Sequence, residues 1–276
     1  MKDKVVACII ARTGSARLPN KVIRKINNKT LIEYIIEKIK HTKEIDEIYL
    51  CTTKESRDQV LVEIAEELGI KSYQGSTTSP ISRMIDVGNI EGATHLIRIT
   101  GDNIFTDEVF LSAMVKKHIE NEMEYTRTEM LPLGISAEIM QFNALKTCLE
   151  RINPNQSEYL TYFMFDPEFY KCQVLIPPKN LQRPYYLLTV DTPEDLKRTE
   201  HLISELYQDN RIFLDDIIEY LETNLVSTKE LRESDTIKLV DKRISYKEWR
   251  DIIEKRIEQS HIIELGETFY NDNKGF

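Results

Sequence analysis

The stretch from Val5 to Ile23 constrains the fold more than any other part of the chain. It begins with six apolar residues, VVACII, a pattern typical of a strand buried on both faces of a sheet. The residues that follow are small, polar and cationic, and they include Ala11, Arg12, Thr13, Gly14, Ser15, Arg17 and Lys21. Small residues let a ligand approach the backbone, and a group of cationic side chains with no acidic residue among them favours the binding of an anion. The sequence therefore predicts a triphosphate bound just after the first strand.

Helix-like and strand-like patterns alternate after this loop. Residues 31–39 and 58–68 have helical apolar spacing. Buried strands are expected at Glu47–Thr53, Ile70–Tyr73 and His95–Thr100. This order implies an α/β protein with a parallel sheet and right-handed crossovers. A later apolar run, Tyr185–Val190, predicts one more core strand, which would end at Asp191.

Changes of pattern divide the chain into a core and an appendage. The alternating elements place a nucleotide-binding core within residues 1–209. Inside it, residues 125–178 have shorter strand-like pieces with Pro and Gly, so this segment is expected to leave the parallel core and to serve acceptor binding or dimerisation. Residues 210–276 have the pattern of charged amphipathic helices and are expected to form a helical appendage.

The charge balance limits the partners of the chain. Its formal net charge is −9, whereas general nucleic-acid binders present a basic surface. The longest apolar runs are much shorter than the roughly 20 residues of a membrane span, and the N-terminus has no signal-peptide pattern. We therefore expect a cytoplasmic protein without a nucleic-acid or membrane partner, in which an anionic ligand needs a local basic site.

Two aspartates follow predicted strands far from the first loop. Asp102 follows His95–Thr100, and Asp191 follows the run Tyr185–Val190. Ligands of open parallel sheets bind at the carboxyl ends of the strands, so both carboxylates are expected near the cationic loop. Carboxylates that hold Mg²⁺, beside cations that neutralise a triphosphate, are what metal-assisted phosphoryl transfer requires. Asp191 could instead serve the start of the helix that follows it.

The loop lacks both the G-x-x-x-x-G-K-[ST] and the G-x-G-x-x-G patterns, which argues against kinases and dehydrogenases. Residues 10–21, IARTGSARLPNK, instead resemble the A-R-x-G-S-x-R-L-P-x-K signature of bacterial cytidylyltransferases that activate sugar acids. The segments RITGD at 98–102, LGISAE at 133–138 and LTVDTPEDL at 188–196 are similar to further segments of that family, in matching order. The resemblance covers residues 1–206, extends to the CMP-sialic acid and CMP-Kdo synthetases, and is greatest to the spore-coat polysaccharide biosynthesis protein F group.

The resemblance implies a nucleotide-diphospho-sugar transferase fold, a three-layer α/β/α sandwich with a mostly parallel sheet and a Rossmann-like half. It also implies a homodimer that transfers CMP from CTP to a sugar acid or related acceptor, releases pyrophosphate and contributes to cell-surface glycan biosynthesis. Mg²⁺ would be the cofactor, held by Asp102 and Asp191.

Individual site residues follow from the same resemblance. Catalytic roles are implied for Arg12, Lys21, Asp102 and Asp191. Nucleotide contacts are implied for Ala11, Arg12, Thr13, Gly14, Ser15, Lys21, Gly75, Ser76, Ser82, Arg83 and Asp102. Acceptor contacts are implied for Arg17, Glu138, Glu158 and Tyr159, although Arg17 could instead pair with a carboxylate and Glu138 could simply end a strand. The chain departs from the family pattern at residues 77–79, which are not acidic, and at Tyr159, which replaces a histidine.

Three other functions remain open. A phosphorylated or phosphonate acceptor would use the same nucleotide-binding half. A glycosyltransferase of the same fold typically needs a D-x-D metal motif, and the chain has only Asp215-Asp216, away from any predicted strand end. The two departures from the family pattern would also suit an inactive nucleotide-binding homologue. Pyrophosphate release measured over four NTPs and a panel of acceptors would separate these functions.

Overall fold

An eight-stranded sheet organises the part of the chain that the structure describes. The computed structural model describes residues 2–15, 17–224, 226, 230–240 and 242–274. In spatial order, the strands are β12 (His261–Glu264), β9 (Cys172–Ile176), β7 (Tyr125–Thr128), β8 (Glu138–Gln141), β6 (His95–Thr100), β1 (Val5–Ile10), β4 (Glu47–Thr53) and β5 (Lys71–Gly75). Short two-stranded sheets pair β2 (Lys25–Ile26) with β3 (Lys29–Thr30), and β10 (Thr236–Leu239) with β11 (Lys242–Ser245).

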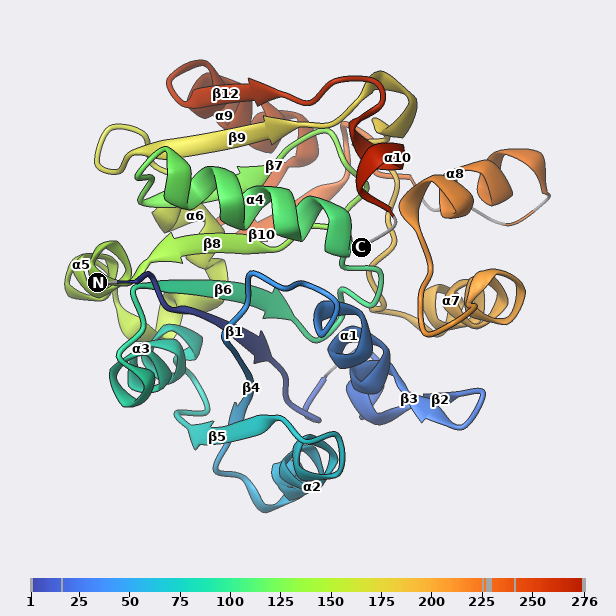
Figure 1. Ribbon diagram of the computed structural model, residues 1–276, viewed down its shortest axis with the longest axis horizontal. Helices are drawn as coiled ribbons and strands as arrows, with labels where there is room; N and C mark the ends of the chain where they lie inside the picture. Colours follow the sequence, from blue (N-terminus) through green and yellow to red (C-terminus); the bar gives the residue numbers. More distant parts are fainter. Residues whose placement is uncertain (1, 16, 225, 227–229, 241, 275–276) are drawn as a thin grey trace.

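Helices cover both faces of the main sheet (Figure 1). One face packs against α1 (Leu31–Ile39), α2 (Gln59–Glu67) and α4 (Glu108–Glu120). The other packs against α3 (Pro80–Glu91), α5 (Phe142–Arg151), α6 (Leu160–Met164) and α9 (Tyr246–Glu258). A third apolar cluster contains α7 (Pro193–Leu206), α8 (Leu214–Thr223) and α10 (Phe269–Asn273). The 3-10 helices are η1 (Lys21–Ile23), η2 (Ser56–Asp58), η3 (Pro154–Tyr159) and η4 (Lys179–Leu181). Across the described ranges, every helix is too short or too polar to cross a lipid bilayer.

The first strand shows why three layers form. Val5, Ala7 and Ile9 belong to the cluster under α1, α2 and α4, whereas Val6 and Cys8 belong to the cluster on the opposite face. Alternate side chains of a strand point to opposite faces, so an unbroken apolar run buries both. The predicted three-layer α/β/α sandwich is confirmed, and its sheet is mostly parallel because only β8 runs antiparallel to its neighbours β6 and β7.

The order of the strands places a crevice beside β1. The chain moves from β1 to β4 and β5 on one side, and then returns to pair β6 with the other side of β1. Connections that leave β1 and β6 therefore run in opposite directions. Such a switch point leaves a crevice outside the carboxyl ends of the two strands, where ligands of α/β proteins bind.

The predicted core strand at Tyr185–Val190 is wrong. Isolated bridges join Leu187 to Leu133 and Tyr186 to Glu230 instead of a continuous ladder. The neighbouring places beside β6 are already taken by β1 and β8. The apolar character of the segment has another cause, because Leu188 and Val190 are buried in the cluster that contains α7 and α8.

Two further expectations need correction. Residues 125–178 supply β7, β8 and β9, so this segment lies within the main sheet and does not leave the core. Residues 210–276 supply strands as well as helices, and β12 pairs in parallel with β9 at the edge of the sheet. The C-terminal segment is therefore not a purely helical appendage. Dimerisation through residues 125–178 stays a prediction.

Candidate active site

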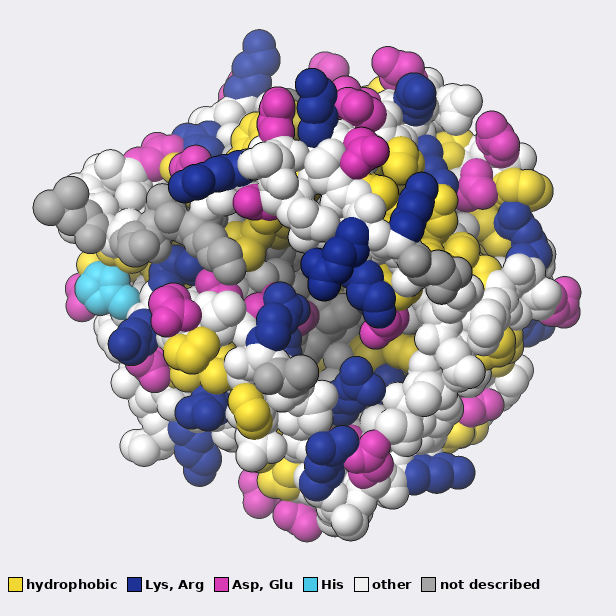
Figure 2. All heavy atoms as spheres, turned by 180° about the vertical axis from the view of Figure 1, so that it is seen from behind, with side chains coloured by type: hydrophobic (Ala, Val, Ile, Leu, Met, Phe, Trp, Pro, Cys, Tyr) yellow, Lys and Arg dark blue, Asp and Glu magenta, His cyan; other side chains and the backbone are white. Residues whose placement is uncertain are grey.

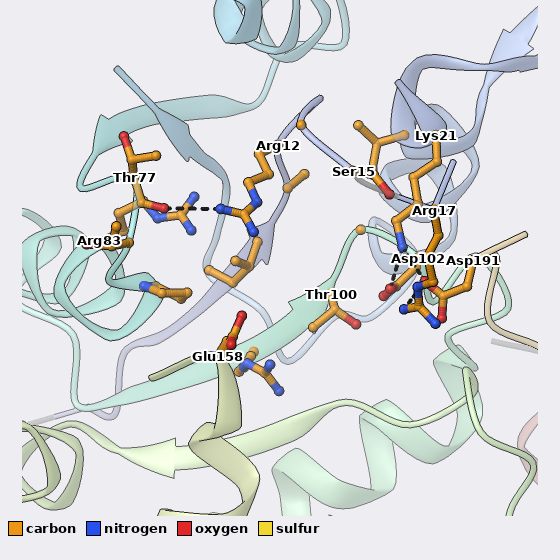
Figure 3. A pocket seen from close by; sticks show the side chains of 18 residues that line it. Arg12, Ser15, Arg17, Lys21, Thr77, Arg83, Thr100, Asp102, Glu158 and Asp191 are labelled. Atoms are coloured by element: carbon orange, nitrogen blue, oxygen red, sulfur yellow. Dashed lines mark hydrogen bonds and ion pairs between the residues drawn. The ribbon is translucent and has the colours of Figure 1, made fainter. Parts of the chain in front are cut away.

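A cavity of about 470 Å³ lies at the carboxyl ends of β1 and β6. Its wall includes many of the residues predicted from the sequence, namely Ala11, Arg12, Gly14, Ser15, Arg17, Lys21, Arg83, Asp102, Glu158 and Asp191. Figure 3 shows Arg17, Lys21 and the two aspartates together at one end, with Arg12 and Arg83 toward the other. The crevice expected from the strand order is thus lined by charged groups of both signs.

Lys21 connects two aspartates at one end of this cavity. Its Nζ donates hydrogen bonds to Asp102 Oδ2 at 2.7 Å and to Asp191 Oδ1 at 2.9 Å. Arg17 Nη2 lies 2.8 Å from the same Asp191 oxygen, so Arg17 does pair with a carboxylate. Burial lowers the pKa of Lys21, but the two carboxylates outweigh burial and hold this pKa above its ordinary value. Burial raises the pKa of Asp102, but Lys21 outweighs burial and holds this pKa below its ordinary value.

The buried carboxylate of Asp58 fixes the loop that follows β1. Its Oδ1 accepts hydrogen bonds from Thr13 N at 2.8 Å and from Thr13 Oγ1 at 2.6 Å, and its Oδ2 accepts one from the Thr53 hydroxyl. The Thr13 carbonyl accepts from Ser15 N and Asn20 N, both at 3.0 Å. Thr13 therefore shapes the loop from behind, and the structure does not bring it to the cavity wall as a nucleotide contact.

A glycine allows the ends of β1 and β6 to approach. Gly101 N donates to Ile10 O at 3.0 Å. A Cβ at residue 101 would lie 3.0 Å from Ala11 Cβ and 3.1 Å from Val22 Cγ1. Contacts this short force neighbouring atoms to move. The absence of a side chain here lets Asp102 approach the cationic loop.

Asp191 reaches the cavity without a preceding strand. Val190 N donates to Asp102 O at 3.2 Å, which brings the two aspartate backbones together. Helix α7 is capped by a reciprocal pair, because Asp195 N donates to Thr192 Oγ1 at 3.2 Å and Thr192 N donates to the Asp195 carboxylate at 3.0 Å. The Asp191 side chain does not cap α7 and instead contacts the cations of the loop.

The other end of the cavity carries positive charge. Arg83 is only 2% exposed, and its Nη1 donates to Cys51 O at 2.8 Å. Arg12 is exposed, and its Nη1 donates to Thr77 O at 3.4 Å. On the face drawn in Figure 2, Lys and Arg side chains gather around a central hollow. A chain of net charge −9 thus presents a local basic surface that suits an anion.

Some predicted residues lie elsewhere in the structure. Beyond the wall of this cavity are Thr13, Gly75, Ser76, Ser82, Glu138 and Tyr159. Gly75 packs against the buried Arg83, since a Cβ on Gly75 would lie 2.6 Å from Arg83 Cγ. The Ser82 hydroxyl lies 2.7 Å from that of Ser79, at the start of α3. Roles of Thr13, Gly75, Ser76 and Ser82 in nucleotide binding stay predictions, as do roles of Glu138 and Tyr159 in acceptor binding.

A second cavity, of about 410 Å³, adjoins the first and shares Arg98, Thr100 and Asp191 with it. Glu138 lies on its wall and accepts hydrogen bonds from Arg98 and Tyr125. Sequence reasoning did not find several wall residues, among them Arg127, Glu129, Trp249 and Arg250. For Trp249 and Arg250, the visible sign in the sequence is an aromatic residue beside a charged one on an amphipathic helix.

The chemistry of the Lys21 end suits a magnesium ion. Mg²⁺ prefers oxygen ligands and is usually held by one or two carboxylates together with substrate phosphates and water. Asp102 and Asp191 each direct an oxygen at the same cation, Lys21 Nζ. Within the described ranges, groups of three or more ligating His, Cys, Asp or Glu side chains are absent. A substrate triphosphate would therefore have to complete the coordination.

Known proteins place this chain in a family. The sequence model of a family described as cytidylyltransferase matches residues 6–244. The spore coat polysaccharide biosynthesis protein SpsF of Bacillus subtilis is 28% identical over 240 residues, which are 84% of this chain and 100% of that protein. The 3-deoxy-manno-octulosonate cytidylyltransferase of Solibacter usitatus is 22% identical and matches 73% of this chain and 95% of its own length.

A solved structure has the same fold. The cytidylyltransferase of Leptospira borgpetersenii matches with a TM-score of 0.75 and 26% identity, covering 81% of this chain and 95% of that chain. The family match includes the cationic loop, both aspartates and the strands that position them. The chain therefore belongs to the cytidylyltransferase family, a family of nucleotidyltransferases.

Proposed function

We propose that this protein transfers CMP from CTP to a sugar acid, with release of pyrophosphate, in the biosynthesis of a cell-surface glycan. The contact of Lys21 with both Asp102 and Asp191, at one end of a basic cavity, is the observation that carries the proposal. The names of two relatives support the glycan product and the sugar-acid acceptor. One is named for spore coat polysaccharide biosynthesis, and the other for 3-deoxy-manno-octulosonate, a sugar acid. A homodimer is part of the proposal and rests on the resemblance alone, whereas a cytoplasmic location is proposed from the sequence pattern.

The charged residues have separate tasks in this reaction. Arg12 and Lys21 bind oxygens of the triphosphate and hold the α-phosphorus in line with the acceptor hydroxyl. The bond between the acceptor oxygen and the α-phosphorus forms as the bond to the departing pyrophosphate breaks, and the proton of the acceptor hydroxyl passes to solvent. These cations also neutralise the charge that develops on the pyrophosphate. Asp102 and Asp191 would hold Mg²⁺, which when bound polarises the phosphoryl oxygens and neutralises part of their charge.

Pyrophosphate release tests this proposal directly. The assay compares the four NTPs, each with Mg²⁺ or with EDTA, against a panel of sugar acids, phosphorylated polyols and phosphonates. We expect turnover with CTP, Mg²⁺ and a sugar acid, and loss of turnover in Asp102→Asn with an unchanged circular-dichroism spectrum. Calorimetric binding of CTP without turnover on any acceptor would show an inactive homologue and contradict the proposal.

A further inference from the structure

The second cavity has a wall that lies beyond the family match. Four of its residues come from α9: Tyr246, Trp249, Arg250 and Ile253. Their spacing of three, four and seven residues places them on one face of the helix. The family match ends at residue 244, before α9 begins. The family resemblance therefore accounts for the nucleotide cavity but not for this wall.

The same cavity lies where an acceptor would have to bind. It shares Asp191, Arg98 and Thr100 with the first cavity, so a ligand in it contacts the aspartate end of the nucleotide site. Its volume of about 410 Å³ falls within the range of ordinary small-molecule sites. The opposite wall comes from β7, β8 and the loop between them, which include Arg127, Glu129 and Glu138.

Charged side chains from the two walls meet at one carboxylate. Glu129 is 6% exposed, and its Oε1 lies 2.8 Å from Arg127 Nη2. Its Oε2 accepts a hydrogen bond from Arg250 Nη1 at 3.2 Å. Arg250 Nη2 also lies 3.8 Å from the exposed Glu254. Two guanidinium groups thus face one buried carboxylate, and Arg127 Nε and Nη1 have no hydrogen-bond partner in the described part of the chain.

The charge balance favours a monoanionic ligand. The side chains of Arg98, Arg127 and Arg250 line the cavity together with those of Glu129 and Glu138. Asp191 also lines it, but Lys21 and Arg17, which do not line this cavity, offset its charge. The set therefore has one positive charge in excess. A carboxylate would neutralise it, and guanidinium groups match carboxylate geometry. A phosphomonoester carries about −1.5 to −2 charges at pH 7 and would leave buried negative charge beside Glu129 and Glu138.

We propose that the face of α9 around Trp249 and Arg250 forms one wall of the acceptor pocket and determines which acceptor binds. Arg250, together with Arg127, pairs with the carboxylate of the acceptor, and Trp249 packs against the carbon chain. This inference rests on the proposed function, because it assigns the acceptor of that reaction. The α9 residues thereby act in specificity, and the chemistry stays at the Lys21 end.

The single tryptophan of the chain is a direct reporter of this pocket. Its fluorescence is followed during titration with 3-deoxy-manno-octulosonate, N-acetylneuraminate, ribitol 5-phosphate, 2-aminoethylphosphonate and mannitol, with CTP present and EDTA to prevent turnover. We expect a saturable change with at least one of the two sugar acids and a weaker one with the other compounds. A response confined to phosphorylated compounds, or no response to any compound, would overturn the inference.

Two arginines of α9, Arg250 and Arg256, provide a matched pair of substitutions to glutamine. Arg250→Gln is expected to raise the dissociation constant of the sugar acid about tenfold or more, because a charge-assisted contact is lost. Arg250→Lys should restore part of the affinity. In the control, Arg256→Gln removes a guanidinium whose Nη1 donates to Tyr162 O at 2.6 Å, away from the cavity, and should change the constant less than about twofold.

The two proposals fail in different ways. CTP affinity, measured by calorimetry, should be unchanged in all three α9 variants. Equal effects of Arg250→Gln and Arg256→Gln, or no effect of Arg250→Gln on a sugar acid that binds, would overturn the role of α9 alone. A wild-type protein that binds a sugar acid through Trp249 but never releases pyrophosphate from CTP would contradict the proposed function and support the pocket.

Discussion

At the scale of residues, Lys21 joins the cationic loop to both candidate metal ligands. Its Nζ is shared between Asp102 and Asp191, so the two carboxylates are held close together and their repulsion is offset. Triphosphate oxygens are also strong acceptors for an ammonium group. Lys21 can therefore exchange a carboxylate contact for a phosphate contact without leaving this end of the cavity.

Replacing Lys21 should weaken nucleotide binding more than it weakens the fold. We expect Lys21→Ala to raise the dissociation constant of CTP about tenfold or more, since a charge-assisted hydrogen bond to phosphate is lost. Calorimetry with CTP measures this change. Lys25→Ala, an exposed lysine four residues away, is the matched control and should leave the constant nearly unaltered. An unchanged constant in Lys21→Ala would remove this residue from the nucleotide site.

Replacing Asp58 should make stability less sensitive to acid. Asp58→Asn breaks the hydrogen bonds to Thr13 and Thr53 and should cost about 1–3 kcal/mol near neutral pH. Burial raises the pKa of Asp58, but its hydrogen bonds outweigh burial and hold this pKa below its ordinary value. The wild-type advantage is therefore present above about pH 4 and is lost as the pH falls through the lowered pKa. Urea unfolding of both proteins at several pH values measures this. A difference that grows on acidification would contradict the prediction.

At the scale of elements, local sequence patterns predicted the strands beside the site and its cationic loop, but not the contacts that hold the segment before Asp191. Glu47–Thr53 and His95–Thr100 were predicted with the bounds that the structure shows, because both are short runs rich in apolar and β-branched residues, most of which are buried in the sheet. Tyr185–Val190 has the same apolar pattern, yet it is buried by helices and a loop. Apolar periodicity indicates burial and cannot distinguish these two surroundings.

The role of Asp58 was not predicted either, because its partner Thr13 lies 45 residues away.

The loop between β7 and β8 holds the segment that ends at Asp191. Leu133 N donates to Tyr186 O at 2.9 Å, and Leu188 N donates to Leu133 O at 2.7 Å. The next residue, Gly134, has a φ of 106°, and a Cβ there would lie 2.7 Å from Thr189 N. A larger residue at 134 is therefore strained and also pushes the backbone that carries Asp191.

Gly134→Ala should impair both stability and turnover. We expect a loss of about 1–3 kcal/mol of unfolding free energy from the strained backbone, together with a lower kcat because Asp191 moves. Gly266→Ala is the control, since a Cβ at 266 would meet nothing within 4 Å. Thermal unfolding and pyrophosphate release compare the two variants. Equal behaviour of both would show that the loop does not position Asp191.

At the scale of the whole molecule, the C-terminal segment is built into the fold. Tyr270 of α10 is 2% exposed, and its hydroxyl donates to the Asp107 carboxylate and accepts from Leu214 N at 2.8 Å. Strand β12 adds an edge to the sheet and contacts α9. The sequence pattern could not reveal this, because β12 is a four-residue strand with a largely exposed surface. Its position depends on β9, far away in the chain.

Removing one hydroxyl should test this attachment. Tyr270→Phe leaves the buried Asp107 oxygen and Leu214 N unpaired, and we expect a loss of about 1–3 kcal/mol in the free energy of unfolding. Tyr220→Phe removes a hydroxyl that contacts exposed His201 and should change this free energy by less than about 0.5 kcal/mol. Urea denaturation measures both. If the free energy of unfolding in a single cooperative transition is the same in Tyr270→Phe as in the wild type, α10 is not attached through this hydroxyl.

The lysine that joins the two aspartates also has a consequence for folding. Its partners lie 81 and 170 residues away along the chain, so the cluster exists only after most of the chain has reached its final topology. Such distant contacts form late, because long loops must close first. A nascent or partly folded chain therefore lacks the Lys21 end of the site, which we propose binds phosphate. Nucleotide that binds this end favours only the finished molecule, so CTP should protect the completed fold in proportion to its affinity.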